Sequence, residues 1–212
     1  SGLTLSGTDA PNYSLTQPTT TADITPKGLT VSGITANNKV YDGNTTATLN
    51  TASAALVGVV SGDTVNLNTG SAAGAFADKN VGTGKTVNVS GLTLSGTDAP
   101  NYSLTQPTTT ADITPKGLTV SGITANNKVY DGNTTATLNT ASAALVGVVS
   151  GDTVNLNTGS AAGAFADKNV GTGKTVNVSG LTLSGTDAPN YSLTQPTTTA
   201  DITPKGLTVS GI

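Results

Sequence analysis

The sequence predicts an all-β protein made of small domains that are joined end to end in an elongated rod. The chain repeats with a period of 89 residues, so that residues 1–89 equal residues 90–178, and residues 179–212 equal residues 1–34. Polar and apolar residues alternate along most of each copy, which is typical of half-buried strands. Clusters of turn-forming residues recur about every 8–12 residues, as they do in β-sandwiches and barrels.

The strand signal is clearest where β-branched residues alternate with polar ones. Thr makes up 17 of the 89 residues, and both Thr and Val favour a pleated, half-buried surface. Strict alternation occurs in Leu29–Val31, Thr46–Leu49, Thr64–Asn68 and Thr86–Val89. Residues 52–60 are ambiguous, because they could form a short helical turn that leads into a strand. Each copy is expected to fold as a small β-sandwich-like domain, Ig-like or β-grasp-like.

The alternation changes phase at two Ser-Gly pairs. Val87 and Val89 occupy odd positions, whereas the apolar residues after Ser90-Gly91 occupy even ones. The same change occurs across Ser32-Gly33. A one-residue phase change at Gly predicts a β-bulge or a tight bend. A strand bent in this way can pass from one sheet to another.

A turn is expected at Asp42-Gly43, between the segments Lys39–Tyr41 and Asn44–Ala47. An Asp-Gly pair between two alternating segments is a strong signal for a β-hairpin. We expect Tyr41 to be a core anchor, with its hydroxyl bonded to a neighbouring group, because buried tyrosines usually find such a partner. Asp42 and Gly43 are expected to make the turn.

The copies are joined without a linker. Ala22–Lys27 runs directly into the next strand segment, and no Gly/Ser-rich or Pro-rich stretch separates them. Consecutive domains are therefore expected to meet end to end with little freedom. A strand shared across the Pro26-Lys27-Gly28 junction would make each unit complete only with its neighbour. We expect this junction and Tyr13 to have structural roles.

The composition excludes much of the usual chemistry. The chain has no Cys and no His, so it lacks the ligands of structural zinc sites and the base of a Ser-His-Asp triad. A net charge of −3 and a pI near 4.5 argue against nucleic acid, which requires a basic surface. The chain contains no run of 18 apolar residues, so its sequence does not predict a membrane-spanning segment. We therefore expect no enzyme activity, and we predict no catalytic, cofactor-binding or metal-binding residue.

Several weaker patterns have structural explanations. Gly82–Thr86 looks like the end of a phosphate-binding loop, but Lys79 occupies the position of the first Gly, and a strand follows instead of a helix. The Asp residues lack calcium-loop spacing, and those in turns, such as Asp63 and Asp78, are expected to bond their own backbone. Calcium at a domain junction nevertheless stays open. An intramolecular isopeptide crosslink, which requires Lys, Asn and a carboxylate, stays open too, because the chain contains all three residue types. A Thr array for ice binding is disfavoured by the long period.

Glycosylation also stays open. Acceptor sequences of the type N-x-[ST] are common in a chain so rich in Asn and Thr, and they can arise by chance. They occur at Asn12, Asn44, Asn88, Asn101, Asn133, Asn177 and Asn190.

Five motifs in a fixed order give each copy a recognisable signature. They are Lys39–Ala47, Gly62–Val65, Lys79–Lys85, Asp98–Leu104 and Ala111–Lys116. Together they closely resemble the YDG repeat of large bacterial surface proteins, the filamentous-haemagglutinin-like adhesins. They are also similar to the MBG repeats that often accompany it. The resemblance spans the whole repeat.

The resemblance implies a domain organisation and a role. It places repeat units at 28–116 and 117–205, the C-terminal part of a preceding repeat at 1–27, and the start of the next repeat at 206–212. The family consists of tandem β-rich modules in the stalk of an exported adhesin, so an extracellular location on the bacterial cell surface is implied. Nothing in the family implies catalysis.

Two functions from different classes are consistent with these patterns. The first is a structural extender that projects a binding region away from the cell, with neighbouring identical repeats as its partners and the chain as a monomer. The alternative is a repeat that itself binds a glycan or a host protein through multivalency. A binding surface would expose aromatic residues, whereas the pattern predicts that Tyr13, Tyr41 and Phe76 are mostly buried.

Overall fold

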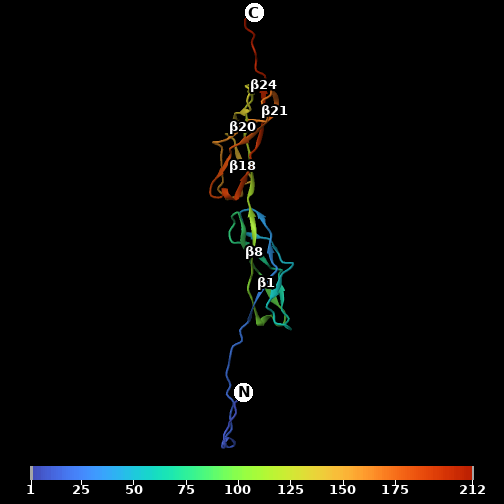
Figure 1. Cartoon of the computed structure of the whole chain (residues 1–212), viewed down its shortest axis with the longest axis vertical. Helices are drawn as coiled ribbons and strands as arrows, with labels where there is room; N and C mark the ends of the chain where they lie inside the picture. The colour runs from blue at the N-terminus through green and yellow to red at the C-terminus, as the bar shows by residue number, and fades with distance from the viewer. Residues whose placement is uncertain (1, 212) are drawn as a thin grey trace.

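A computed structural model of the chain describes residues 2–211 and shows two β-rich units arranged end to end, with an extended tail at each end (Figure 1). The strands of the first unit lie between Lys27 and Thr114, and those of the second unit lie between Lys116 and Thr203. Residues 89 positions apart occupy the same place in the two units, and we call them equivalent. The prediction of an all-β chain with tandem domains joined end to end is confirmed.

Each unit contains the same set of short strands in the same order. In the first unit these are β1 (Lys27–Ser32), β2 (Thr35–Ala36), β3 (Lys39–Val40), β4 (Thr46–Ala47), β5 (Leu49–Asn50), β6 (Ala55–Val57), β7 (Asn66–Asn68), β8 (Ala73–Phe76), β9 (Gly82–Ser90), β10 (Thr93–Ser95), β11 (Tyr102–Leu104) and β12 (Thr108–Thr114). In the second unit they are β13 (Lys116–Ser121), β14 (Thr124–Ala125), β15 (Lys128–Val129), β16 (Thr135–Ala136), β17 (Leu138–Asn139), β18 (Ala144–Val146), β19 (Asn155–Asn157), β20 (Ala162–Phe165), β21 (Gly171–Ser179), β22 (Thr182–Ser184), β23 (Tyr191–Leu193) and β24 (Thr197–Thr203).

Helical structure is limited to single 3-10 turns. They are η1 (Ala10–Asn12), η2 (Ala99–Asn101) and η3 (Ala188–Asn190). The ambiguous residues 52–60 contain the strand β6 and no helix. Within residues 2–211, no helix is long and apolar enough to cross a membrane.

The central sheet of the first unit has the order β3-β12-β9-β8-β4, and β15-β24-β21-β20-β16 is its equivalent in the second unit. A three-stranded sheet, β11-β1-β6, covers the N-terminal half of the first unit, with a parallel β1–β11 pair and an antiparallel β1–β6 pair. Two small sheets, β10-β7 and β2-β5, complete the unit. The sequence predicted a small sandwich-like β domain, and the structure shows that each unit is barrel-like.

The predicted hairpin at Asp42-Gly43 is wrong, although the turn itself is present. The two strands that flank the turn, β3 and β4, lie on opposite edges of the five-stranded sheet and do not pair with each other. Instead β3 pairs with β12 in parallel, and β4 pairs with β8 in antiparallel fashion. A turn that links the two edges of one sheet requires the sheet to curl, which accounts for the barrel-like shape.

The side chain of Lys39 spans the gap between these two edges. Its Nζ donates hydrogen bonds to the carbonyl oxygens of Asn44 at 3.0 Å and Thr46 at 3.1 Å, and it forms an ion pair with Asp42 at 2.6 Å. Lys128 makes the same set of contacts in the second unit. The charge of one partly buried lysine therefore satisfies backbone carbonyls on the far side of the turn, where the two strands do not pair. The sequence patterns gave no indication of this role.

The predicted bends at Ser-Gly pairs are present and move the chain between sheets. β1 ends at Ser32 and β9 ends at Ser90, and the next strand in each case belongs to a different sheet. Gly33 and Gly91 both have φ +78°. A Cβ at Gly33 would lie 1.9 Å from the carbonyl oxygen of Ser53. Only glycine fits a left-handed bend with backbone that close.

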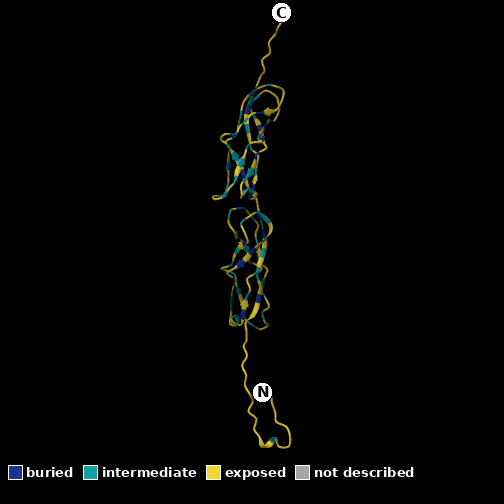
Figure 2. Ribbon diagram, turned by 90° about the vertical axis from the view of Figure 1, so that its left-hand side faces the viewer, coloured by how far each residue is buried: buried dark blue, intermediate teal, exposed yellow. Residues whose placement is uncertain are grey.

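Within the two complete units, apolar residues that the alternating pattern predicts to face inward form the core. Val87, Val89 and Phe76 are buried in the first unit, and their equivalents are buried in the second. Thr86 and Asn88, which flank Val87 in β9, are exposed. The core is therefore a narrow stripe of small and medium-sized side chains along a slender unit (Figure 2).

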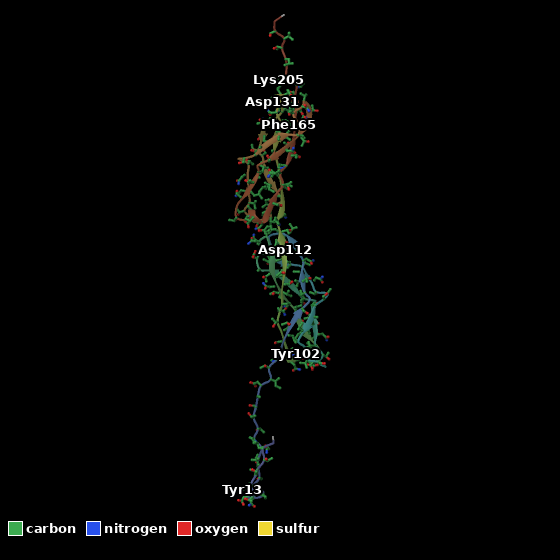
Figure 3. The ribbon with its side chains drawn as sticks, in the orientation of Figure 1. Tyr13, Tyr102, Asp112, Asp131, Phe165 and Lys205 are labelled. Atoms are coloured by element: carbon green, nitrogen blue, oxygen red, sulfur yellow. The ribbon has the colours of Figure 1, made fainter. Side chains whose placement is uncertain are left out.

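The two tails have the sequence of folded segments but none of their strands. Residues 2–26 and 204–211 contain no strand, and Figure 2 shows them almost entirely exposed. Tyr13 is 72% exposed in the N-terminal tail, whereas its equivalent Tyr102 is 8% exposed at the base of the first unit (Figure 3). The expectation that Tyr13 is a buried structural residue is therefore wrong. The reason is that Tyr102 pairs with β1 and bonds Asp63 of its own unit, whereas Tyr13 lies in the strand-free segment 2–26.

We expect Lys39→Ala to destabilise the first unit by about 2 kcal/mol, because hydrogen bonds to a charged group contribute about 1.5–3 kcal/mol. Urea unfolding followed by circular dichroism measures this change. Lys128→Ala should cost the second unit the same amount. Lys27→Ala removes an exposed lysine and should change stability by less than about 0.5 kcal/mol. Equal effects at Lys39 and Lys27 would contradict the role of Lys39 in closing the sheet.

Candidate functional site

The junction between the two units contains both shared core residues and hydrogen bonds from one unit to the other. β12 ends at Thr114 and β13 begins at Lys116, so that Pro115 alone separates two strands of different units. One cluster of buried residues continues through this point. It contains Tyr41 and Ile113 of the first unit together with Leu118 and Tyr191 of the second. The units therefore share a continuous core.

The carboxylate of Asp152 lies at the centre of the junction. Its side chain is buried, and its Oδ2 accepts hydrogen bonds from the hydroxyls of Tyr191 at 2.6 Å and Tyr41 at 2.8 Å. Its Oδ1 accepts a hydrogen bond from Lys79 Nζ at 3.0 Å. Tyr41 and Lys79 belong to the first unit, so two of the three donors come from across the junction.

A second group of contacts surrounds this carboxylate. Lys79 Nζ also lies 3.5 Å from Asp187 Oδ1. The backbone N–H of Val81 donates to Asn190 Oδ1 at 2.9 Å, and the amide of Asn190 donates to Asn80 Oδ1 at 3.3 Å. Asn190 is buried as a result. These contacts fix the orientation of one unit on the other, because each depends on a directional hydrogen bond.

The two junction tyrosines also pack against each other. Their ring centroids are 5.4 Å apart with the planes at 73°, which is an edge-to-face arrangement. Lys79 Nζ lies 5.9 Å from the centre of the Tyr41 ring. A Cβ added to Gly43 would lie 2.8 Å from Val149 of the second unit, whereas one added to the equivalent Gly132 would meet nothing within 4 Å. The turn at Gly43 is therefore part of the interface.

The charges at the junction stabilise one another. Burial by itself raises the pKa of Asp152, but the hydrogen bonds from Tyr191, Tyr41 and Lys79 outweigh it and hold this pKa below its usual value. The hydrogen bond to Asp152 is the main cause that raises the pKa of Lys79. Burial, followed by the hydrogen bond to Asp152, raises the pKa of Tyr191 to about 12. The lysine stays charged and the carboxylate ionised over the whole neutral range.

The structural residues expected from the sequence lie in part at this junction. Tyr41 is buried as expected, and the partner of its hydroxyl belongs to the next unit. Asp42 Oδ1 accepts from the backbone N–H of Asn44, and Gly43 has φ +82°, so both make the turn as expected. The Pro26-Lys27-Gly28 junction leads from the exposed tail into β1, and its equivalent at Pro115 joins the two complete units.

Sequence reasoning missed the residues that hold the units together. Lys79, Asp152 and Asn190 were not expected to meet, because they lie in different copies. Asp63 was expected to bond its own backbone, which is wrong, since it accepts the hydroxyl of Tyr102 at 2.6 Å. Asp152 and Tyr191 repeat this pair in the second unit. A Tyr–Asp pair within each unit therefore prepares the surface that the preceding unit completes.

The motifs that resembled a phosphate-binding loop, a metal site and an isopeptide crosslink lie in structural settings in the fold. Gly82–Thr86 forms the start of β9, and Lys85 forms an ion pair with Asp78 at 2.8 Å. Within residues 2–211, no three His, Cys, Asp or Glu side chains gather in a way that could hold a metal ion. Lys79 and Asp152, two of the three residue types that an isopeptide crosslink requires, form an ion pair at 3.0 Å.

Comparison with known proteins identifies the repeat. A family model described as the YDG domain matches residues 25–111 and residues 114–200. No curated protein and no solved structure matches the chain significantly.

We expect Asp152→Ala to destabilise the chain by about 3 kcal/mol more than Asp63→Ala. Both variants lose the Tyr–Asp pair within a unit, but only Asp152→Ala also loses the contacts to Tyr41 and Lys79 across the junction. Urea unfolding of the two variants measures the difference. Equal losses would mean that the cross-junction contacts contribute nothing to stability.

The junction should be strongest between about pH 4 and pH 10. The lowered pKa of Asp152 gives stability that is present above the usual value of 3.8 and is lost as the pH falls through the folded-state pKa. The raised pKa of Tyr191 gives stability that is present below 10.0 and is lost as the pH rises towards about 12.

The measurement is the stability difference between the wild-type chain and Asp152→Asn across this pH range, because Asn cannot ionise. We expect the difference to be constant near neutral pH and to shrink below about pH 4 and above about pH 10. A difference that is unchanged at pH 3 would contradict the role of the ionised carboxylate.

Proposed function

The chain belongs to the YDG domain family, which it contains in two tandem copies, and on this premise we propose that it is a structural extender in the stalk of a bacterial surface adhesin. Its task is to hold a binding region away from the cell, in an extracellular location. The mechanism is mechanical and involves no catalytic step and no cofactor. Each unit adds length, and each junction keeps the direction of the rod.

The shared core and the buried Asp152 cluster are the observation that carries this proposal. A junction held by one covalent link would let the units move as beads, as in flexible linkers. Here the strand path through Pro115, the edge-to-face tyrosines and the hydrogen bonds to Asp152 and Asn190 act together. Several contacts placed around the axis resist bending in more than one direction, which is what a stiff extender requires.

The alternative, a repeat that binds a glycan or host protein directly, has less support. Such surfaces are usually rich in exposed aromatic residues. Tyr41 and Phe76 are buried in the first unit, and Phe165 and Tyr191 are buried in the second. The exposed Tyr13 lies in the tail, where no complete unit surrounds it. The aromatic residues of complete units therefore support folding and stacking.

A distance measurement across the junction tests the extender proposal. The chain has no Cys, so Val57→Cys and Val146→Cys, which replace exposed equivalent residues, give two specific positions for spin labels. We expect a narrow distribution of label–label distances, because the junction holds the units in one orientation. Adding calcium or a chelator should leave the distribution unchanged.

The matched variants are Asp152→Ala and Asp63→Ala in the same labelled chain. Asp152→Ala should broaden the distribution, whereas Asp63→Ala, at the end of the first unit that lies away from the junction, should not. A broad distribution for the chain without these substitutions would mean that the units behave as separate beads. The extender proposal would then lose its support, and direct ligand binding would be tested next.

A further inference from the structure

A pull along the rod enters each unit through one strand and leaves it through another. In the second unit the chain arrives from β12 through Pro115, continues directly into β13, and leaves after β24. In the first unit it arrives at β1 and leaves after β12. Tyr102 at the start of β11 lies at the lower end of the first unit, whereas Asp112 in β12 lies close to the second unit (Figure 3). The segment from β11 to β12 therefore follows the long axis of the rod.

The entry strand is paired in parallel with a strand that leads directly to the exit. β13 pairs with β23, and Lys116 lies opposite Tyr191 where the pair begins. The backbone N–H of Thr194 donates to the carbonyl oxygen of Leu118 at 3.0 Å, at the other end of this pair. Only residues 194–196 separate β23 from β24. The shortest load path through the unit therefore runs from β13 across these hydrogen bonds into β23 and out through β24.

A second neighbour holds the other half of the entry strand. The residues of β13 from Thr119 to Ser121 pair with β18 in antiparallel fashion. The sheet order β18-β13-β23 places the entry strand in the middle of its sheet. In the first unit β1 lies between β11 and β6 in the same way. A pull on the entry strand must therefore slide it past two neighbours.

The direction of the pull decides how these hydrogen bonds are loaded. Hydrogen bonds between strands lie across the strand direction, and the entry strand runs parallel to the strand that leads to the exit. A pull that drags the entry strand backwards out of the unit therefore acts along the strands. All hydrogen bonds of the pair then share the load and must break together, whereas a pull across the strands breaks them one at a time.

A buried leucine anchors the entry strand in the core. Leu118 of β13 and its equivalent Leu29 of β1 are both fully buried, and Leu118 belongs to the core that the two units share. Its neighbours Gly117 and Thr119 are exposed, because successive side chains of a strand point to opposite faces. Sliding the strand by one residue would bring a residue of the exposed face into the core. The leucine therefore opposes the first step of sliding.

The exit strand is held over a greater length than the entry strand. β24 pairs with β21 along Thr197–Ala200 and again at Ile202, and its end also pairs with β15. The six residues of β13 are divided between two neighbours. Because the load passes through both strands in series, the strand with the shorter pairs yields first. The entry strand therefore sets the load at which a unit unfolds.

The junction holds the partner of the entry strand in place. Tyr191 begins β23 opposite Lys116, and its hydroxyl donates to Asp152 at 2.6 Å. Asp152 also accepts hydrogen bonds from Tyr41 and Lys79 of the first unit. The contacts across the junction therefore meet β23 at the point where the load passes to it from β13.

We propose that the units bear tension along the rod, and that β1 and β13 are their mechanical clamps. A clamp is the entry strand of a unit together with the two neighbours that it must slide past. The small sheets β10-β7 and β19-β22 lie outside the load path, and they stabilise the unit without carrying the pull. This function goes beyond the extender role, which concerns bending, and it rests on that role only for the source of the load.

Single-molecule force spectroscopy on the full chain tests this proposal. The chain has no Cys, so Ser14→Cys and Ser210→Cys, which lie in exposed segments without strands, attach the handles that apply the pull. We expect two discrete unfolding steps of the same size, because each unit gives way as a whole once its clamp breaks. The unfolding rate of each step under a constant pull is the measured quantity.

Two double variants remove a buried leucine from each unit, one inside the clamp and one outside it. Leu29→Ala/Leu118→Ala changes the clamps. Leu92→Ala/Leu181→Ala changes residues that are also buried but lie outside the entry and exit strands. Both variants should lose stability in urea to a similar extent. Under a constant pull the clamp variant should unfold about tenfold faster than the control variant, since only the clamp contacts are broken when the unit gives way.

A second pair of double variants strengthens strands and therefore keeps the fold. Gly28 and Gly117 lie in the clamps, and a Cβ at either would lie 3.9 Å from the hydroxyl oxygen of the opposite serine, so a valine fits. Gly28→Val/Gly117→Val should unfold about fivefold more slowly than the wild-type chain under a constant pull, because Val stabilises a strand that Gly weakens. Ala75→Val/Ala164→Val, at exposed positions of β8 and β20, should leave the rate unchanged.

Either of two results would overturn the proposal. The first is that clamp and control variants change the unfolding rate under load equally, which would mean that β1 and β13 carry no special share of the pull. The second is that the wild-type chain lengthens gradually without discrete steps, which would mean that the units do not bear tension. Neither result bears on the extender role, which the label distances test. A broad distribution of label distances, in turn, would leave the load path within each unit unchanged.

Discussion

The buried carboxylate of Asp152 is the contact on which the two-unit arrangement depends. It accepts one hydrogen bond from its own unit and two from the preceding unit. A carboxylate at this depth is costly to bury unless donors surround it, and the preceding unit supplies them. The orientation of the units is therefore set by the need to satisfy a charge at a defined point, in addition to the apolar area that the shared core removes from water.

Identical segments of this chain adopt different structures because their neighbours differ. Tyr13 and Leu207 are exposed in the tails, while the same side chains are buried wherever a complete unit surrounds them. The first strand of the second unit, β13, follows the last strand of the first unit, β12, after Pro115 alone. Stability in such an array is the sum of terms within units and between neighbours, and here both terms use the same strand path.

Two links run side by side from one unit to the next. The first is the covalent path from β12 through Pro115 into β13, and the second is the cluster around Asp152, Tyr41 and Lys79. Within each unit, Lys39 or Lys128 closes the curled sheet to which these links are attached. Polar contacts therefore add to the stabilisation that the narrow apolar core of each unit provides.

The sequence by itself determined the repeat, the β class, the bends at Gly33 and Gly91, and the burial of Val87 and Phe76. These follow from local rules, since alternation and glycine conformation act over a few residues. Only the tertiary structure decided that β3 and β4 lie on opposite sheet edges, that Lys39 joins them, and that Asp152 meets Tyr41. Those contacts arise from strand pairing within a unit and from the stacking of one unit on the next. They join residues that are not neighbours in the sequence, so no local pattern encodes them.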